Sequence, residues 1–277
     1  MTTHEFRPMG IGDILDTTFR LYRQRFLTFL LIALVVYVPY AFLMAAFQPF
    51  GMAPQPVPGI HEQTALHPGQ AQLPPAMAIN PVGAVLGGIG FVVFTIILLP
   101  LCGAAIVQNI SGSYLGKDLT AGQSYARAVP RLLGLLGTQF LTTLMIMVGM
   151  ILCIVPGIIF SLWFLVVVPV VILESKAGPT AMRRSRELMR GNINKGFVLA
   201  FVVGILTFII NMGLSTLMRL VPLPHPAIGI FIQTVLLAII LPLQTAPWIL
   251  LYYDLRIRKE AFDLQQLAEA MRQANVT

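Results

Sequence analysis

The stretch FLTFLLIALVVYVPYAFLMAA, residues 26–46, contains no charged side chain and no histidine. A helix that crosses the hydrocarbon core of a bilayer needs roughly 20 mostly apolar residues, so this stretch is long enough to span a membrane. Further runs that also lack charges and histidine cover residues 82–107, 132–154, 157–173, 197–218 and 227–253. The pattern predicts an all-α integral membrane protein, a helical bundle with six transmembrane helices.

The composition supports this prediction. Of the 277 residues, 57% are hydrophobic and 10% are charged, against about 45–50% and about 25% in average soluble domains. The mean hydropathy of +0.82 excludes a soluble globular domain. The net charge is +7, but the cations lie between apolar runs and not over a water-facing surface. This distribution argues against a protein that binds nucleic acid.

The distribution of cations predicts the orientation in the membrane, because Lys and Arg near span ends remain on the cytoplasmic side. With a cytoplasmic N-terminus, every one of the 18 Lys and Arg residues except Arg219 falls on the cytoplasmic side. The opposite orientation would reverse this bias. We therefore expect both termini in the cytoplasm.

A short amphipathic segment precedes the first, third and fifth spans. The first lies within residues 1–25, and the third occupies residues 179–190. The second begins at Thr120, which forms a capping-box pattern with Gln123. Each segment is expected to be a cytoplasmic interfacial helix in the headgroup plane. A unit of one interfacial helix and a two-span hairpin is thus used three times.

A second repeated feature is a proline inside each even-numbered span. These prolines follow aliphatic residues, at Leu99-Pro100, Val168-Pro169 and Leu241-Pro242. Proline kinks a helix. The shared position supports a triplication of the interfacial-helix-plus-hairpin unit.

The remaining segments are a linker and a tail. Residues 47–81 are rich in proline and predict a flexible extracytoplasmic loop. Residues 254–277 form a cytoplasmic tail, in which residues 263–273 predict one short amphipathic helix. The whole chain, residues 1–277, is expected to be a single six-span membrane domain.

Potential metal ligands occur only in poor spacing. His61, Glu62 and His67 lie in the sequence HEQTALH, whereas the zincin motif HExxH places both histidines on one helical face. Cys102 and Cys153 are too far apart for a paired-cysteine site. We predict no metal site, no catalytic residue and no cofactor.

Cations near the span ends are candidate contacts for anionic lipid, which such cations attract by about 1 kcal/mol each near the surface. They also act as topology signals, and both interpretations stay open. The segment around residues 183–190 is expected to rest on the membrane. The candidate lipid contacts are Arg20, Arg23, Arg183, Arg184, Arg186, Arg190, Arg256 and Arg258.

Three segments resemble a known family. They are GDILDTTFRLYRQRF at 12–26, VVVPVVILESKAGPTAMRRSRELMRGN at 166–192 and APWILLYYDLRIRKEAFDL at 246–264. Together they resemble the membrane domain of bacterial glycerophosphoryl diester phosphodiesterases, which also occurs in stand-alone membrane proteins. In the fused relatives a separate soluble barrel carries the hydrolysis. The resemblance therefore implies a bacterial inner-membrane protein without phosphodiesterase activity.

These observations predict a non-enzymatic protein that organises or senses its lipid or protein surroundings. Its expected partners are anionic phospholipids, and a second membrane protein or another copy of this chain is left open. One alternative is a passive or lipid-handling transporter with a pathway lined by Gln and Asn, since no carboxylate or histidine lies in a span to couple transport to ions. Another is a membrane enzyme acting on lipid headgroups through Glu174, Asp254 or Glu260.

Overall fold

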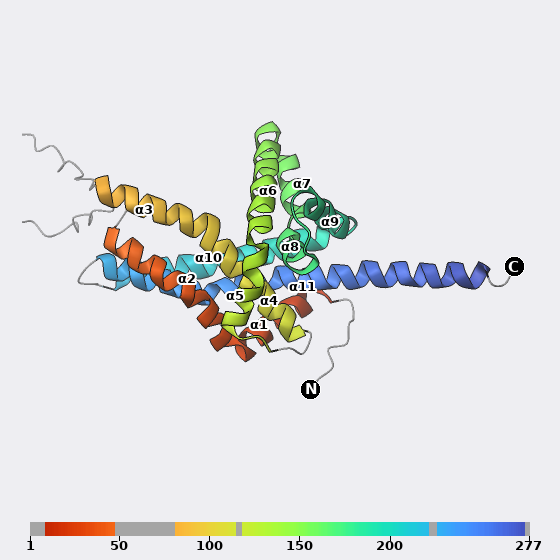
Figure 1. Cartoon of the computed structure of the whole chain (residues 1–277), viewed down its shortest axis with the longest axis horizontal. Helices are drawn as coiled ribbons and strands as arrows, with labels where there is room; N and C mark the ends of the chain where they lie inside the picture. Colours follow the sequence, from red (N-terminus) through yellow and green to blue (C-terminus); the bar gives the residue numbers. More distant parts are fainter. Residues whose placement is uncertain (1–8, 48–80, 115–117, 222–225, 275–277) are drawn as a thin grey trace, which may run out of the picture.

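The computed structural model describes residues 9–47, 81–114, 118–221 and 226–274, which are almost entirely helical (Figure 1). No strand occurs among them. The α-helices are α1 (Ile11–Gln24), α2 (Phe26–Phe47), α3 (Pro81–Val93), α4 (Leu99–Tyr114), α5 (Ala121–Ala128), α6 (Leu132–Leu152), α7 (Ile154–Trp163), α8 (Val167–Glu174), α9 (Pro179–Met189), α10 (Ile193–Leu220) and α11 (Pro226–Ala274). A π-helical turn, η1 (Phe94–Leu98), joins α3 to α4, and a 3-10 turn, η2 (Val129–Arg131), joins α5 to α6.

Within the described residues, six helical stretches are long and apolar enough to cross a membrane. This finding confirms the predicted fold class. The stretches are Phe26–Ala46, Val85–Ser113, Ala121–Leu152, Ile154–Glu174, Ile193–Met218 and Ala227–Glu260.

The core of the protein lies where α2, α4 and α11 pack together. Ile32 of α2, Ala104 of α4 and Leu250 of α11 are fully buried in one hydrophobic cluster. The α6–α7 hairpin, by contrast, stands across the direction of α10 and α11 in Figure 1. The six stretches therefore form a helical bundle, as predicted, but its helices are not all aligned with one another. Apolar runs of similar length do not encode the angles at which helices cross.

Two glycines allow the α6–α7 hairpin to close tightly. A Cβ atom on Gly149 would lie 3.0 Å from the Cα atom of Gly157 and 2.8 Å from the ring of Phe160. Only glycine at this position lets the two helix backbones approach so closely.

The predicted amphipathic segments are helices α1, α5 and α9. The capping box of α5 is confirmed: the Thr120 hydroxyl accepts the Gln123 N–H at 3.3 Å, and the Gln123 side chain accepts the Thr120 N–H at 3.1 Å. The protein itself covers part of these apolar faces: Ile14 of α1 and Leu188 of α9 are both 0% exposed, whereas Phe19 of α1 is 43% exposed. An apolar face of this periodicity suits a neighbouring helix as well as lipid, so the position of these helices in the headgroup plane stays a prediction.

Two of the three even-numbered spans depart from regular helix close to their repeated prolines. At η1, the Leu99 N–H donates to the Phe94 carbonyl oxygen, five residues back, just before Pro100. The fourth span is interrupted between α7 and α8, shortly before Pro169. The sixth keeps a continuous helix, although Pro242 lies inside it.

The predictions for the linker and for the tail have different outcomes. Residues 48–80, which include His61, Glu62 and His67, lie outside the described residues. The predicted helix at 263–273 is not a separate element but the C-terminal part of α11, which in Figure 1 projects beyond the other helices.

Candidate functional site at the charged helix ends

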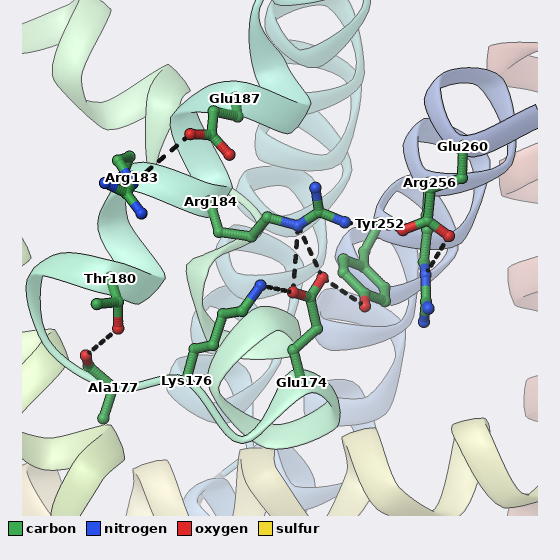
Figure 2. A network of polar contacts seen from close by, with 10 residues as sticks. All are labelled: Glu174, Lys176, Ala177, Thr180, Arg183, Arg184, Glu187, Tyr252, Arg256 and Glu260. Atoms are coloured by element: carbon green, nitrogen blue, oxygen red, sulfur yellow. Dashed lines mark hydrogen bonds and ion pairs between the residues drawn. The ribbon is translucent and has the colours of Figure 1, made fainter. Parts of the chain in front are cut away.

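A polar cluster forms around Arg184 of α9 (Figure 2). Its Nε donates to both carboxylate oxygens of Glu174, each at 3.1 Å, and its Nη2 donates to Glu260 Oε1 at 2.8 Å. Burial alone would lower the pKa of Arg184, but the hydrogen bonds to Glu174 and Glu260 raise it above its ordinary value. Because Glu174 ends α8 and Glu260 lies on α11, one permanently charged side chain joins three helices.

Both carboxylates of this cluster have further partners. The Lys176 Nζ lies 2.7 Å from Glu174 Oε2, and the Tyr252 hydroxyl donates to Glu174 Oε1 at 3.1 Å. Arg256 Nε donates to Glu260 Oε2 at 2.8 Å. Glu174 is only 10% exposed, so its charge depends on these partners and not on water.

The turn between α8 and α9 brings the two halves of this cluster together. Gly178 has a φ of 60°, in the region that glycine adopts most readily, and Pro179 begins α9 directly after it. The Gly178 N–H donates to the Thr138 hydroxyl on α6 at 2.7 Å. This bond anchors the turn, so that α9 folds back beside α8.

A second cluster surrounds Asp254 of α11, which is 0% exposed. It forms an ion pair with Lys195 near the start of α10, and Arg258 Nε contacts its two oxygens at 3.1 and 3.0 Å. The Met9 N–H donates to Asp254 Oδ1 at 2.6 Å. The Met9 carbonyl accepts hydrogen bonds from Lys195 at 2.5 Å and from Arg258 at 3.0 Å. Asp254 therefore fastens Met9, two residues before α1, to both α10 and α11.

The two clusters contain every carboxylate that a headgroup-modifying enzyme was expected to use. Glu174, Asp254 and Glu260 are each held by two cationic side chains. These contacts join neighbouring helices and give each carboxylate a structural role. In the part of the chain that the structure describes, no group of three or more His, Cys, Asp or Glu side chains could hold a metal ion.

A basic pocket of about 440 Å³ lies on α9, on the side that carries Arg183. The Arg186 guanidinium carbon lies 4.1 Å from the centre of the Trp163 ring, a cation–π contact. The Ser185 hydroxyl donates to the Trp163 carbonyl oxygen at 2.7 Å and holds α9 against the end of α7. We call this the α9 pocket; its lining residues are Trp163, Arg183, Arg186, Glu187, Arg190 and Ile193.

Helix α1 carries a second basic pocket, of about 490 Å³. One exposed face of this helix supplies it, and Phe19 there is 43% exposed. The pocket is lined by Asp16, Phe19, Arg20, Arg23 and Gln24.

The structure divides the predicted lipid contacts into two sets. Five line the basic pockets: Arg20 and Arg23 on α1, and Arg183, Arg186 and Arg190 on α9. The other three are ion-paired with carboxylates: Arg184, Arg256 and Arg258. Lipid contact by any of the eight stays a prediction.

Sequence reasoning missed the partners that complete these sites. Trp163 ends α7 but lies inside the fourth apolar span, and nothing in its neighbourhood signals a contact with an arginine of the next amphipathic helix. Lys195 was counted only among the cytoplasmic cations, and its partner Asp254 lies 59 positions further along the chain. The role of Met9 depends on backbone atoms, which leave no trace in residue type.

Comparison with known proteins adds no assignment. No family model matches the chain, and no solved structure gives a significant match. The resemblance to the membrane domain of glycerophosphoryl diester phosphodiesterases therefore stays a prediction. The six apolar stretches and the charged helix ends describe a multi-pass helical membrane protein.

Proposed function

We propose that this chain is a non-enzymatic protein of the bacterial cytoplasmic membrane that binds anionic phospholipid headgroups and organises the lipid around it. The α9 pocket is the observation that carries this proposal. Three arginines and one glutamate line it, so the balance of charge favours an anion. Guanidinium groups bind phosphate oxygens in a bidentate manner.

The side chains of the α9 pocket suit a lipid better than a free anion. Trp163 and Ile193 contribute apolar surface beside the cations. Trp is enriched at membrane interfaces because its ring has an apolar body and a polar edge. A phospholipid offers both a phosphate for the arginines and a glycerol-acyl region for the tryptophan.

The proposal includes a cytoplasmic location for both basic pockets. Reporter domains fused after Thr277 or within residues 117–127 are expected to be active only in the cytoplasm, and a reporter at Ala65 only outside it. Activity of the Thr277 fusion on the extracytoplasmic side would contradict this orientation. The basic pockets would then not face the anionic cytoplasmic leaflet.

The triple substitution Arg183→Gln, Arg186→Gln and Arg190→Gln tests the proposed lipid site. The variant removes three cations and leaves the nearby carboxylate of Glu187 in place, so the charge of the pocket changes by three, worth about 3 kcal/mol at about 1 kcal/mol per cation. Affinity for phosphatidylglycerol should therefore fall about 150-fold. The measurement is native mass spectrometry of the protein exchanged from nanodiscs that contain phosphatidylglycerol and phosphatidylcholine.

Arg127 and Arg131 provide the matched control, because they lie beside a span but line neither basic pocket. Their double substitution by Gln should leave retention of phosphatidylglycerol almost unchanged. Equal loss in both variants would show that the cations act only through general surface charge. Unchanged retention in the triple variant would refute the lipid site.

A lipid-handling transporter is the second candidate function. A cavity among the even-numbered spans favours it, since the pathway was expected there. Of the amides expected along that pathway, Gln139 lines the cavity, whereas the Asn211 side chain donates to the Thr207 carbonyl oxygen of its own helix.

A further inference from the structure

A cavity of about 300 Å³ lies where the three even-numbered spans meet α6. All its lining residues fall within four of the candidate spans. They are Thr95, Leu99, Pro100, Gly103, Val107, Gln139, Leu165, Val168, Pro169, Leu241, Thr245, Trp248 and Ile249. This cavity is separate from the two basic pockets and shares no residue with them.

The repeated prolines converge on this cavity. The residue before each one, Leu99, Val168 or Leu241, lines it. Near two of these positions the helix is also irregular, through η1 and through the break between α7 and α8. Prolines and π-turns loosen backbone packing, and π-turns are frequent at functional sites. Residues from all three predicted repeat units thus line the same cavity.

The lining is apolar except for a few uncharged polar groups. The described residues provide no hydrogen-bond partner for the Gln139 carboxamide, the Trp248 indole N–H or the Thr95 hydroxyl. In a membrane-spanning region, where water is scarce, unpaired polar groups are costly. The oxygens of a ligand with hydroxyl and ester groups would accept hydrogen bonds from the Trp248 indole N–H and the Gln139 amide N–H. The ligand hydroxyl would in turn donate to the Gln139 carbonyl oxygen.

The residues around the cavity indicate that its ligand enters from the bilayer. Thr95 lies on an exposed apolar face, where Val92 is 51% and Ile96 is 56% exposed. The lining contains no charged side chain to compensate an ionic headgroup. Its volume is at the lower end of small-molecule pockets, about 300–1,000 Å³, which suits one chain better than two.

We propose that this cavity binds a neutral lipid with a single acyl chain and with hydroxyl and ester groups. A monoacylglycerol has this chemistry. The acyl chain packs along the aliphatic wall formed by Leu99, Val168 and Leu241. The ester and hydroxyl oxygens bond to Gln139 and Trp248. This site is independent of anionic lipid at the α9 pocket.

The chain contains two tryptophans, and each reports on one site. Trp248 lines the cavity, whereas Trp163 lines the α9 pocket. A Trp163→Phe variant in phosphatidylcholine nanodiscs therefore emits only from the cavity, and a Trp248→Phe variant emits only from the α9 pocket. The probe is a monoacylglycerol with a dibrominated stearoyl chain, since bromine quenches tryptophan fluorescence on contact.

The Trp163→Phe protein should show saturable quenching that an excess of unbrominated monooleoylglycerol reverses. Dibrominated phosphatidylcholine should give only weak quenching that does not saturate. In the Trp248→Phe protein, dibrominated monoacylglycerol should give no saturable quenching. Dibrominated phosphatidylglycerol tests the α9 pocket in this second protein, so failure of either site is seen separately.

Two substitutions test the site inside the Trp163→Phe background. Gly103 lines the cavity, and a Cβ atom added there would meet nothing within 4 Å. Gly103→Leu should fill the cavity and abolish saturable quenching. Gly204 is the matched control, because it is equally open but lies on α10 outside the cavity, so Gly204→Leu should change nothing.

Gln139→Leu keeps the side-chain volume but removes the hydrogen-bonding group, and should weaken binding about tenfold. This variant decides the matter if Gly103→Leu does not fold. Quenching of Trp248 that rises without saturation would overturn the proposal. So would equal quenching in the Gly103→Leu and Gly204→Leu variants, or an affinity that Gln139→Leu leaves unchanged.

Discussion

Substitution of Asp254 by Asn is expected to lower the free energy of unfolding by about 3–5 kcal/mol, because it removes the charge of a buried carboxylate and leaves two partly buried cations without their counter-charge. Asp254 is 0% exposed, and Lys195, its ion-pair partner, is only 15% exposed. The variant also weakens the acceptor for the Met9 N–H. We expect α1 to loosen from α11 before the protein unfolds globally.

Two measurements in detergent check this result. Thermal unfolding gives the loss of stability, and hydrogen exchange over residues 9–14 reports release of the segment that Met9 anchors. Asp118→Asn is the control, because Asp118 pairs with Arg25 but is 75% exposed. Exposed ion pairs contribute about 0–1 kcal/mol to the free energy of unfolding, so this variant should be almost as stable as the unmodified protein.

A double variant separates lost charge pairing from a general defect. Asp254→Asn combined with Lys195→Met removes the most deeply buried cation together with the carboxylate, and leaves only Arg258, which is 37% exposed. It should recover a substantial part of the stability. A double variant less stable than Asp254→Asn alone, or a loss below about 1 kcal/mol in the single variant, would contradict the role given to this pair.

The sequence predicts the membrane-spanning helices and the start of α5 well. The apolar runs identify all six candidate spans, since a charge inside a span is too costly to be common. The Thr120–Gln123 capping box marks the first residue of α5, because its hydrogen bonds are local. The ion pairs Arg183–Glu187, Arg256–Glu260 and Asp254–Arg258 follow helical spacing and could also be predicted.

Contacts between distant segments could not be predicted in this way. The periodicity of α9 correctly places Leu188 on the apolar face of the helix. It does not distinguish lipid from a neighbouring helix as the partner of that face, because both are apolar. The same limit applies to charge. Adjacent arginines at 183 and 184 are chemically identical and lie about 100° apart around the helix. The seating of α9 on its neighbours decides which one is exposed and which one meets Glu174.

The expectation for these two arginines follows from their different surroundings. Arg184→Gln should lower the free energy of unfolding by about 2 kcal/mol, because Glu174 is 10% exposed and loses the charged N–H that its two oxygens share. The estimate is below that for Asp254, since Arg184 is itself 24% exposed and Glu174 keeps Lys176.

Arg183→Gln is the matched control for Arg184→Gln and should produce the opposite pattern. Arg183 is 77% exposed, and its contact with Glu187 is long, at 3.6 Å, so stability should change by less than about 0.5 kcal/mol. Retention of phosphatidylglycerol should fall in this variant, because Arg183 lines the α9 pocket. Arg184→Gln should keep that lipid at temperatures where it remains folded. If both variants lost lipid and stability in parallel, the division of α9 into a fastening side and a lipid-binding side would be wrong, because a single damaged helix would then explain both effects.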